Sequence, residues 1–238
     1  MYKHFSIFKV ALLDIRNEWS WYLLLMIVNP MAILLFLHFV LGDAIDFVSY
    51  ITGTIVMTFG TGVFLSLGQI FALYKVTNAL DYYLSFPLSK LEIILSLVFR
   101  NIVLSLPSIV VILGIGTFLF EVDVYLGLPF FIALLLISLS LAALGVMVGI
   151  SSKNMQVASI ITQILVPIFT YIAPVFIPQT ALPIPLLYIS YFIPTTYAAN
   201  ALRTAMKTNS FSIDFVILTF FVFISLIIVS RKLDWRNE

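Results

Sequence analysis

Charged residues are scarce in this chain: only 10% of its 238 residues are Asp, Glu, Lys or Arg, whereas 62% are hydrophobic. A soluble domain carries about 25% charged residues. The composition therefore predicts a membrane protein, which is embedded in the lipid bilayer. The formal net charge is only +1. That balance excludes the strongly basic surface on which nucleic-acid binding depends.

Cysteine is absent, and the only two histidines are His4 and His38. Without thiols there can be neither a disulfide framework nor a thiolate metal site. The topology derived below places the two histidines on opposite sides of the membrane, where they cannot share a metal ion. We therefore expect no metal site and no bound cofactor.

The sequence signatures of several enzymes and pumps are also missing. The absence of any Gly-Lys pair excludes a phosphate-binding loop, and no Gly-x-Ser-x-Gly elbow occurs. All eleven Asp and Glu residues lie in loops or near the ends of apolar runs, whereas ion-coupled transporters place ionisable groups within the membrane. We expect no catalytic residues and a driving force supplied by a partner. The alternative is an ion-coupled secondary transporter or a channel.

Six apolar runs each approach the roughly 20 residues that cross a bilayer. The sequence therefore predicts a single all-α transmembrane domain over residues 1–238, with spans at about 21–41, 48–74, 98–120, 126–150, 156–177 and 211–230.

Small and polar residues within these runs are interpreted as packing features. Gly145 and Gly149 are spaced so that a neighbouring helix can approach closely in lipid. Amide side chains inside the membrane more often form hydrogen bonds between helices than contacts with a substrate. This interpretation covers Asn29, Gln69, Asn101, Gln156 and Gln163.

The positions of Lys and Arg predict the topology. If the N-terminus is inside, ten of the twelve basic residues lie in inner segments, and only Arg203 and Lys207 lie outside. An excess of Lys and Arg is typical of cytoplasmic segments. We therefore expect a multi-pass protein of the plasma or inner membrane with both termini in the cytoplasm.

Residues 1–19 have apolar side chains at helical spacing, including Phe5, Phe8, Leu12 and Ile15. This pattern predicts an amphipathic helix that lies in the membrane interface. The alternative is a plain cytosolic extension of the first span.

The segment of about 178–207, between the fifth and sixth runs, is apolar but divided by prolines, among them Pro183, Pro185 and Pro194. It is too short and too interrupted for two further spans, because irregular backbone at membrane depth must be buried in protein or line a cavity. We expect one or two short re-entrant or interfacial helices on the outer side. Thr195 or Thr196 is expected to cap the second of them.

Residues 77–87 (TNALDYYLSFP) form a short amphipathic segment between two long apolar runs. Asn78 is a good N-cap with Asp81 in the capping-box position, and Pro87 ends the helix. Ser89 and Glu92 then form a second capping box that starts the next helix. The sequence thus predicts a helix of about 78–86 on the cytoplasmic face, a form suited to docking into a partner.

Two stretches resemble the type-2 ABC exporter permeases, the six-span subunits of bacterial and archaeal exporters of drugs, lipids and polysaccharides. The family reads Gly-Thr-Leu-Glu-x-Leu-Leu-x-x-Pro-Leu-Ser-Arg after its second span. The segment 78–90 departs from it at Asn78 and Ala79 and lacks the upstream Arg-Glu, but it matches at Leu80, Asp81, Leu84, Pro87, Ser89 and Lys90.

The second stretch, residues 193–203 (IPTTYAANALR), is similar to the family's Asn-Pro-Leu-Thr-Tyr-x-x-Glu-x-Leu-Arg before the last span. Ile193 replaces the usual Asn, and Ala199 or Asn200 stands where Glu is common. The matching positions are Pro194, Tyr197, Leu202 and Arg203.

The resemblance implies an assembly in which two permeases, either two copies or this chain with a paralogue, join two separate ATPase subunits that bind the ATP. Segment 78–86 would be the coupling helix, and it would contact the ATPase through Asp81, Tyr82, Tyr83, Leu84 and Phe86. The tyrosines could instead be anchors in the membrane interface. A hydrophobic or amphiphilic substrate, such as a drug or lipid, would move outward through the interface between the two permeases, which spans two and five would line.

The resemblance also gives a role to the outer segment, which would cap the exit of this pathway. Its motif residues are Pro194, Tyr197 and Arg203. We expect Arg203 near the lipid headgroups of the outer leaflet, or else as a cation that a helix end stabilises through its dipole.

Overall fold

The computed structural model describes residues 19–41, 46–79, 90–118, 120–177, 179 and 182–232. All the regular elements in these ranges are helices, and none of the described residues forms a strand. The predicted all-α class is therefore confirmed.

Within the described residues, four helical stretches are long and apolar enough to cross a bilayer. One of them is a continuous span from Phe47 to Val76, which we call span two. It consists of α3 (Phe47–Phe59), the π-helical segment η2 (Gly60–Leu65) and α4 (Ser66–Val76). The others are α6 (Lys90–Phe118) from Leu95 onward, α7 (Leu128–Ser151), and α8 (Met155–Pro167) together with the π-helical segment η3 (Ile168–Ile172).

These four stretches overlap with the second to fifth apolar runs of the sequence. Helix α2 (Trp19–Leu41) occupies the place of the first run, and α11 (Ile213–Lys232) occupies the place of the last. Between η3 and α11 lie two shorter helices, α9 (Ile184–Ser190) and α10 (Pro194–Thr208). Prolines begin both, because a missing N–H costs nothing in the first turn of a helix.

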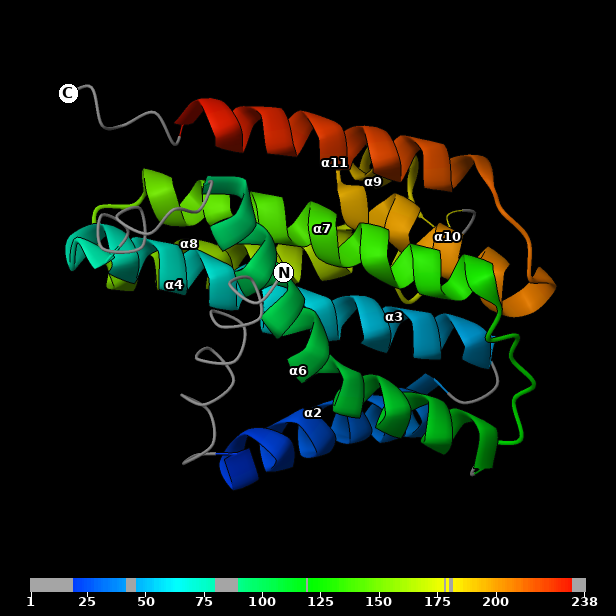
Figure 1. The fold of residues 1–238 in the computed structure, drawn as a ribbon. Coiled ribbons are helices and arrows are strands. Elements are labelled where there is room, and N and C mark those ends of the chain that lie inside the picture. Colours follow the sequence, from blue (N-terminus) through cyan, green and yellow to red (C-terminus); the bar gives the residue numbers. More distant parts are fainter. Residues whose placement is uncertain are drawn as a thin grey trace.

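Successive long helices run in alternating directions, so the connections gather at two ends (Figure 1). At one end, Asp46 pairs with Lys207, and the backbone N–H of Tyr125 donates to the carbonyl of Met206. We call this the Asp46 end. At the other, Lys75 contacts the C-terminal end of α7, and we call this the Lys75 end. By the distribution of basic residues, the Lys75 end is predicted to be cytoplasmic.

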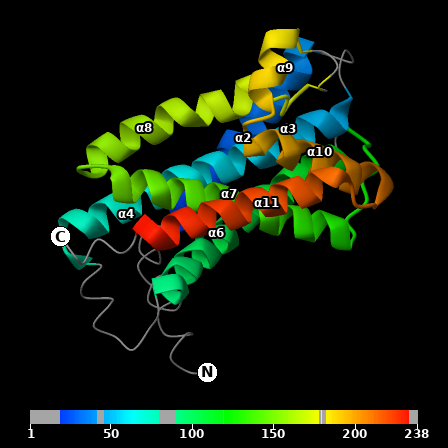
Figure 2. The same cartoon turned by 90° about the horizontal axis from the view of Figure 1, so that it is seen from above.

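Helix α7 lies at the centre of the bundle, where it packs against span two, α10 and α11. Seen from above, α8 and α6 lie on opposite sides of α4 and α7 (Figure 2). Gly145 and Gly149 make the contact with span two possible. A Cβ at Gly145 would lie 2.4 Å from the carbonyl oxygen of Phe64, and one at Gly149 would lie 2.6 Å from that of Gly68. The glycine pair is therefore a packing feature, as the sequence predicted.

Candidate functional site

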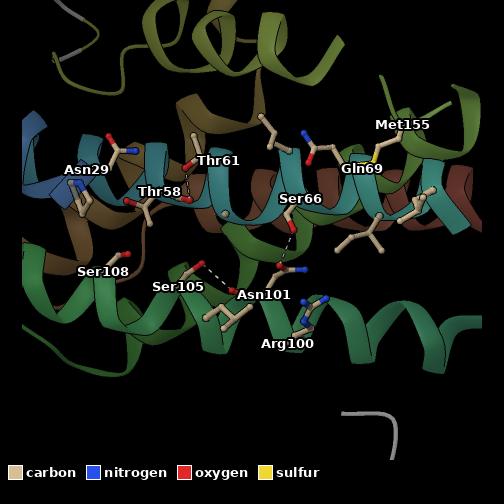
Figure 3. Close-up of a pocket in the computed structure, with 16 residues that line it drawn as sticks. Asn29, Thr58, Thr61, Ser66, Gln69, Arg100, Asn101, Ser105, Ser108 and Met155 are labelled. Carbon is tan, nitrogen blue, oxygen red and sulfur yellow. Dashed lines mark hydrogen bonds between the residues drawn. The ribbon is translucent and has the colours of Figure 1, made fainter. Parts of the chain in front are cut away.

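A cavity of about 540 Å³ lies between α2, span two and α6, with Met155 at the start of α8 on its edge. The side chains that line it come from facing helices (Figure 3). Thr58 and Thr61 come from α3 and η2, whereas Arg100 and Ser105 belong to α6. A volume of this size falls in the range of about 300–1,000 Å³ that is common for small-molecule sites.

Hydroxyl groups in the lining already use their protons within their own helices. Thr58 Oγ1 donates to the carbonyl of Thr54 at 2.8 Å, and Ser105 Oγ donates to that of Asn101 at 2.9 Å. Thr61 Oγ1 likewise donates to the carbonyl of Met57 at 3.2 Å. Because a hydroxyl has one proton and two lone pairs, these oxygens can offer a ligand only hydrogen-bond acceptors.

Two amide side chains connect the helices around the cavity. Asn101 Oδ1 accepts from Ser66 Oγ at 3.2 Å, which joins α6 to α4. Gln69 Nε2 donates to Ser159 Oγ at 3.0 Å, which joins α4 to α8. For Gln69 and Asn101, the predicted use as hydrogen bonds between helices is confirmed. Asn29 lies in the cavity lining instead.

Arg100 is the only charged residue in the described lining, which contains no carboxylate. Its side chain is partly buried, and its buried Nε has no hydrogen-bond partner among the described residues. A buried donor left without an acceptor costs about 1–3 kcal/mol, and a charged group costs more. The sequence placed Arg100 only in an inner segment, because a single basic residue gives no signal of a cavity.

A second polar cluster lies at the Asp46 end, where Arg203 of α10 is buried. Its Nη2 donates to three backbone carbonyls that follow η3, those of Pro174 at 2.7 Å, Val175 at 2.5 Å and Ile177 at 3.1 Å. Its Nη1 donates to Asn200 Oδ1 at 3.1 Å. We call Arg203 with these three carbonyls the arginine clamp.

The arginine clamp corrects the expectation that Arg203 meets lipid headgroups. Arg203 is only 9% exposed. Its guanidinium donates to backbone carbonyls that have no helical partner, because the helical pattern stops at Ile172. The partner is thus the irregular chain after another helix. This contact could not be predicted from the sequence, because Pro174 lies 29 positions upstream of Arg203.

The other residues of the outer motif also hold short helices in place. Pro194 occupies the first turn of α10. Tyr197 Oη donates to the carbonyl of Tyr191 at 2.9 Å, and burial raises the pKa of its phenol.

The predicted capping of α10 is wrong, because Ile193 is its N-cap residue. Thr195 Oγ1 donates to the carbonyl of Phe169 at 2.5 Å, and Thr196 Oγ1 donates to that of Ser190 at 2.6 Å. Both hydroxyls therefore tie α10 to the preceding segments, η3 and α9, rather than to its own N–H groups.

The predicted ATPase contacts, Asp81, Tyr82, Tyr83, Leu84 and Phe86, lie outside the described residues, as do positions 1–18 of the predicted interfacial helix. The structure does describe the residues that lead into the predicted coupling helix. Thr77 ends α4, and Asn78 follows it with a φ of 53°. Asn tolerates this left-handed conformation, which is common just after a helix C-terminus. The sequence pattern predicts Asn78 only as the N-cap of the next helix.

The four apolar helical stretches that are long enough to cross a bilayer define a multi-pass membrane protein. Residues 4–207 match the family model described as ABC-2 type transporter, so the chain belongs to that family, and the resemblance to its permeases is confirmed. A search among curated proteins found no match. As an ABC-2 membrane component, the chain is a permease of an ABC transporter.

Proposed function

We propose that this permease is the membrane subunit of an ATP-driven exporter that moves a hydrophobic or amphiphilic compound, such as a drug or lipid, out of the cell. The ATP would be bound by a separate ATPase subunit. Family membership is the observation that carries this proposal. It is supported by the absence of a phosphate-binding lysine motif in the sequence.

The position of segment 78–86 supports its role as the coupling helix. Helix α4 ends at Val76 and α6 begins at Lys90, so the segment connects two helices at the Lys75 end. The basic residues predict that this end is cytoplasmic, where an ATPase would be found. Closure of the ATPase on ATP would push the segment and reorient span two and α6.

The surface of α8 supports a second permease copy as a partner. Of the four candidate spans, α8 with η3 has the smallest buried share. Ile160 and Ile164 are exposed on it together with the amides of Gln156 and Gln163, of which Gln163 Nε2 donates to Ser159 Oγ of the same helix at 2.7 Å. Lipid alone suits the isoleucines but not exposed amides, because polar groups in hydrocarbon need partners. A second permease would cover both, and a substrate pathway would follow span two and α8 of the two copies.

The test is co-expression with the ATPase subunit encoded beside this chain, followed by purification in nanodiscs and measurement of ATP hydrolysis. We expect a stable complex whose hydrolysis rate depends on the permease. A chain that binds no ATPase would contradict the exporter proposal and would favour ion-gradient transport or a channel. Export of a candidate amphiphile from loaded vesicles on ATP addition would then establish the direction.

A further inference from the structure

We propose that the cavity between α2, span two and α6 binds an anionic lipid headgroup with hydroxyl groups, of the phosphatidylglycerol type. The phosphate would lie at Arg100, and the hydroxyls would lie against Thr58, Thr61 and Ser105. This inference rests on the proposed function in one respect only, namely that the bound lipid is also the compound that the permease exports. The binding itself requires neither the ATPase nor a second permease, because all of these residues belong to one chain.

The charge of the lining selects an anion. Arg100 is the only ionisable residue in the described part of the lining, where no carboxylate neutralises the guanidinium. The buried Nε of Arg100 has no acceptor among the described residues. Charge-assisted hydrogen bonds from guanidinium to phosphate are among the strongest that a side chain makes. A phosphate at this position would therefore supply the acceptor that this Nε lacks among the described residues.

Three hydroxyl groups of the lining favour hydrogen-bond donors on the ligand. The protons of Thr58, Thr61 and Ser105 are used by carbonyls of their own helices, which leaves these oxygens as acceptors. Thr58 and Ser105 face one another across the cavity (Figure 3). A headgroup with free hydroxyls can donate to these oxygens, whereas a choline headgroup has no donor.

The cavity also has an apolar part, formed by Pro30, Leu65, Ile70, Leu73 and Leu104. This combination of one cation, a row of acceptors and apolar side chains is typical of a site for an amphiphile. The volume of about 540 Å³ suits a headgroup with the adjoining part of its acyl chains.

Native mass spectrometry of the purified chain in a neutral detergent tests this proposal. Palmitoyl-oleoyl phosphatidylglycerol and phosphatidylcholine, which share their acyl chains, are titrated separately. We expect the chain to bind phosphatidylglycerol more tightly. Arg100→Gln should weaken that binding about tenfold, the loss of one charge-assisted hydrogen bond to the phosphate. Arg100→Lys should keep most of the preference.

A matched control is Lys153→Gln, because Lys153 is an exposed cation in the turn before α8 and is not part of the lining. It should bind both lipids like the unmodified chain. Thr58→Phe places a ring in the cavity without changing its charge and should weaken phosphatidylglycerol binding as well. If Arg100→Gln and Thr58→Phe both bind phosphatidylglycerol normally, the site assignment is wrong.

Inorganic phosphate distinguishes a lipid site from a site for free anions. Phosphate at millimolar concentration should not displace phosphatidylglycerol, because it lacks the apolar contacts. Displacement would overturn the proposal in favour of a free-anion site. These measurements contain neither ATP nor ATPase, so their failure leaves the exporter proposal intact. A failure to bind the ATPase would equally leave the lipid site intact.

Discussion

Lys75 Nζ donates to the carbonyl oxygen of Ile150 at 2.8 Å and to that of Ser152 at 3.3 Å. Lys75 lies in the last turn of α4, and both acceptors lie at the C-terminal end of α7. The last carbonyls of a helix lack partners within the helix and carry partial negative charge. One cation therefore holds two spans together at the end where the chain leaves α4 towards the predicted coupling helix.

Replacing Lys75 by Met should destabilise the protein by about 1–3 kcal/mol, because two carbonyls lose a charged donor. Lys75→Arg should retain most of the stability. Thermal unfolding in detergent, followed by tryptophan fluorescence, measures the change. Lys153→Met is the control, since Lys153 is exposed in the same turn region. An equal loss in both variants would show that net charge, and not the contact with α7, is responsible.

Gly145→Ala should lower the free energy of unfolding by about 1–3 kcal/mol, as overpacking typically does. The added methyl group would collide with the carbonyl of Phe64, and helices α7 and η2 would have to separate. Gly114→Ala is the matched control, because nothing lies within 4 Å of a Cβ built there. If both variants unfold at the same temperature as the unmodified chain, the close contact between α7 and span two is wrong.

Replacing Arg203 by Met should cost about 1.5–3 kcal/mol or more, because the carbonyls of Pro174, Val175 and Ile177 lose a charged donor. The loosening should be confined to the Asp46 end. Hydrogen exchange of the segment after η3 should rise, while that of α4 should not change. Normal protection of residues 173–177 in this variant would contradict the arginine clamp.

The arginine clamp should not respond to pH between 6 and 9. Burial lowers the pKa of Arg203 to about 10, and the carboxylate of Asp46 opposes that shift. For a base whose pKa is lower in the folded state, stability changes only above the folded value, where the folded state begins to lose its proton first. The difference in unfolding temperature between the unmodified chain and Arg203→Met should therefore be constant over this range. A difference that grows towards pH 9 would mean that Arg203 loses its proton earlier, because stability rises with pH wherever the unfolded state binds more protons.

Asp81→Lys combined with Leu84→Asp should abolish ATPase association and leave membrane insertion intact, if segment 78–86 is the coupling helix. The charge at its start would be reversed, and an apolar contact residue would become charged. Co-purification with the ATPase measures the effect. Asp123→Lys with Leu126→Asp makes the same exchanges at exposed positions of the Asp46 end and should co-purify normally. Normal co-purification of the first double variant would remove the coupling assignment.

Features that depend on local pattern could be predicted from the sequence. The apolar runs give helices because a backbone in lipid must satisfy its own hydrogen bonds. Pro183 and Pro194 place the starts of the short helices near the observed α9 and α10. Gly145 and Gly149 are spaced for a close helix contact, and the contact is present.

Features that depend on distant contacts could not be predicted. Arg203 looked like an outer-leaflet cation because its acceptors lie far upstream in the sequence. No sequence pattern around Arg100 indicates a cavity, because the cavity forms only where α2, span two and α6 pack together. The π-helical turns η2 and η3 have no sequence signature of their own, although Pro167 precedes η3 directly.

The π-helical segment η2 has a consequence for the whole of span two. A π turn holds an extra residue relative to an α turn, and each residue of an α-helix corresponds to about 100° of rotation. If η2 rewound to regular α spacing, α4 would rotate against α3 and carry Lys75 away from the end of α7. Gly145 fits against Phe64 inside η2, and Gly149 fits against Gly68 beyond it. These two glycine contacts therefore fix the rotation of α4 about its axis. Helix α4 in turn leads directly into the segment that is predicted to contact the ATPase.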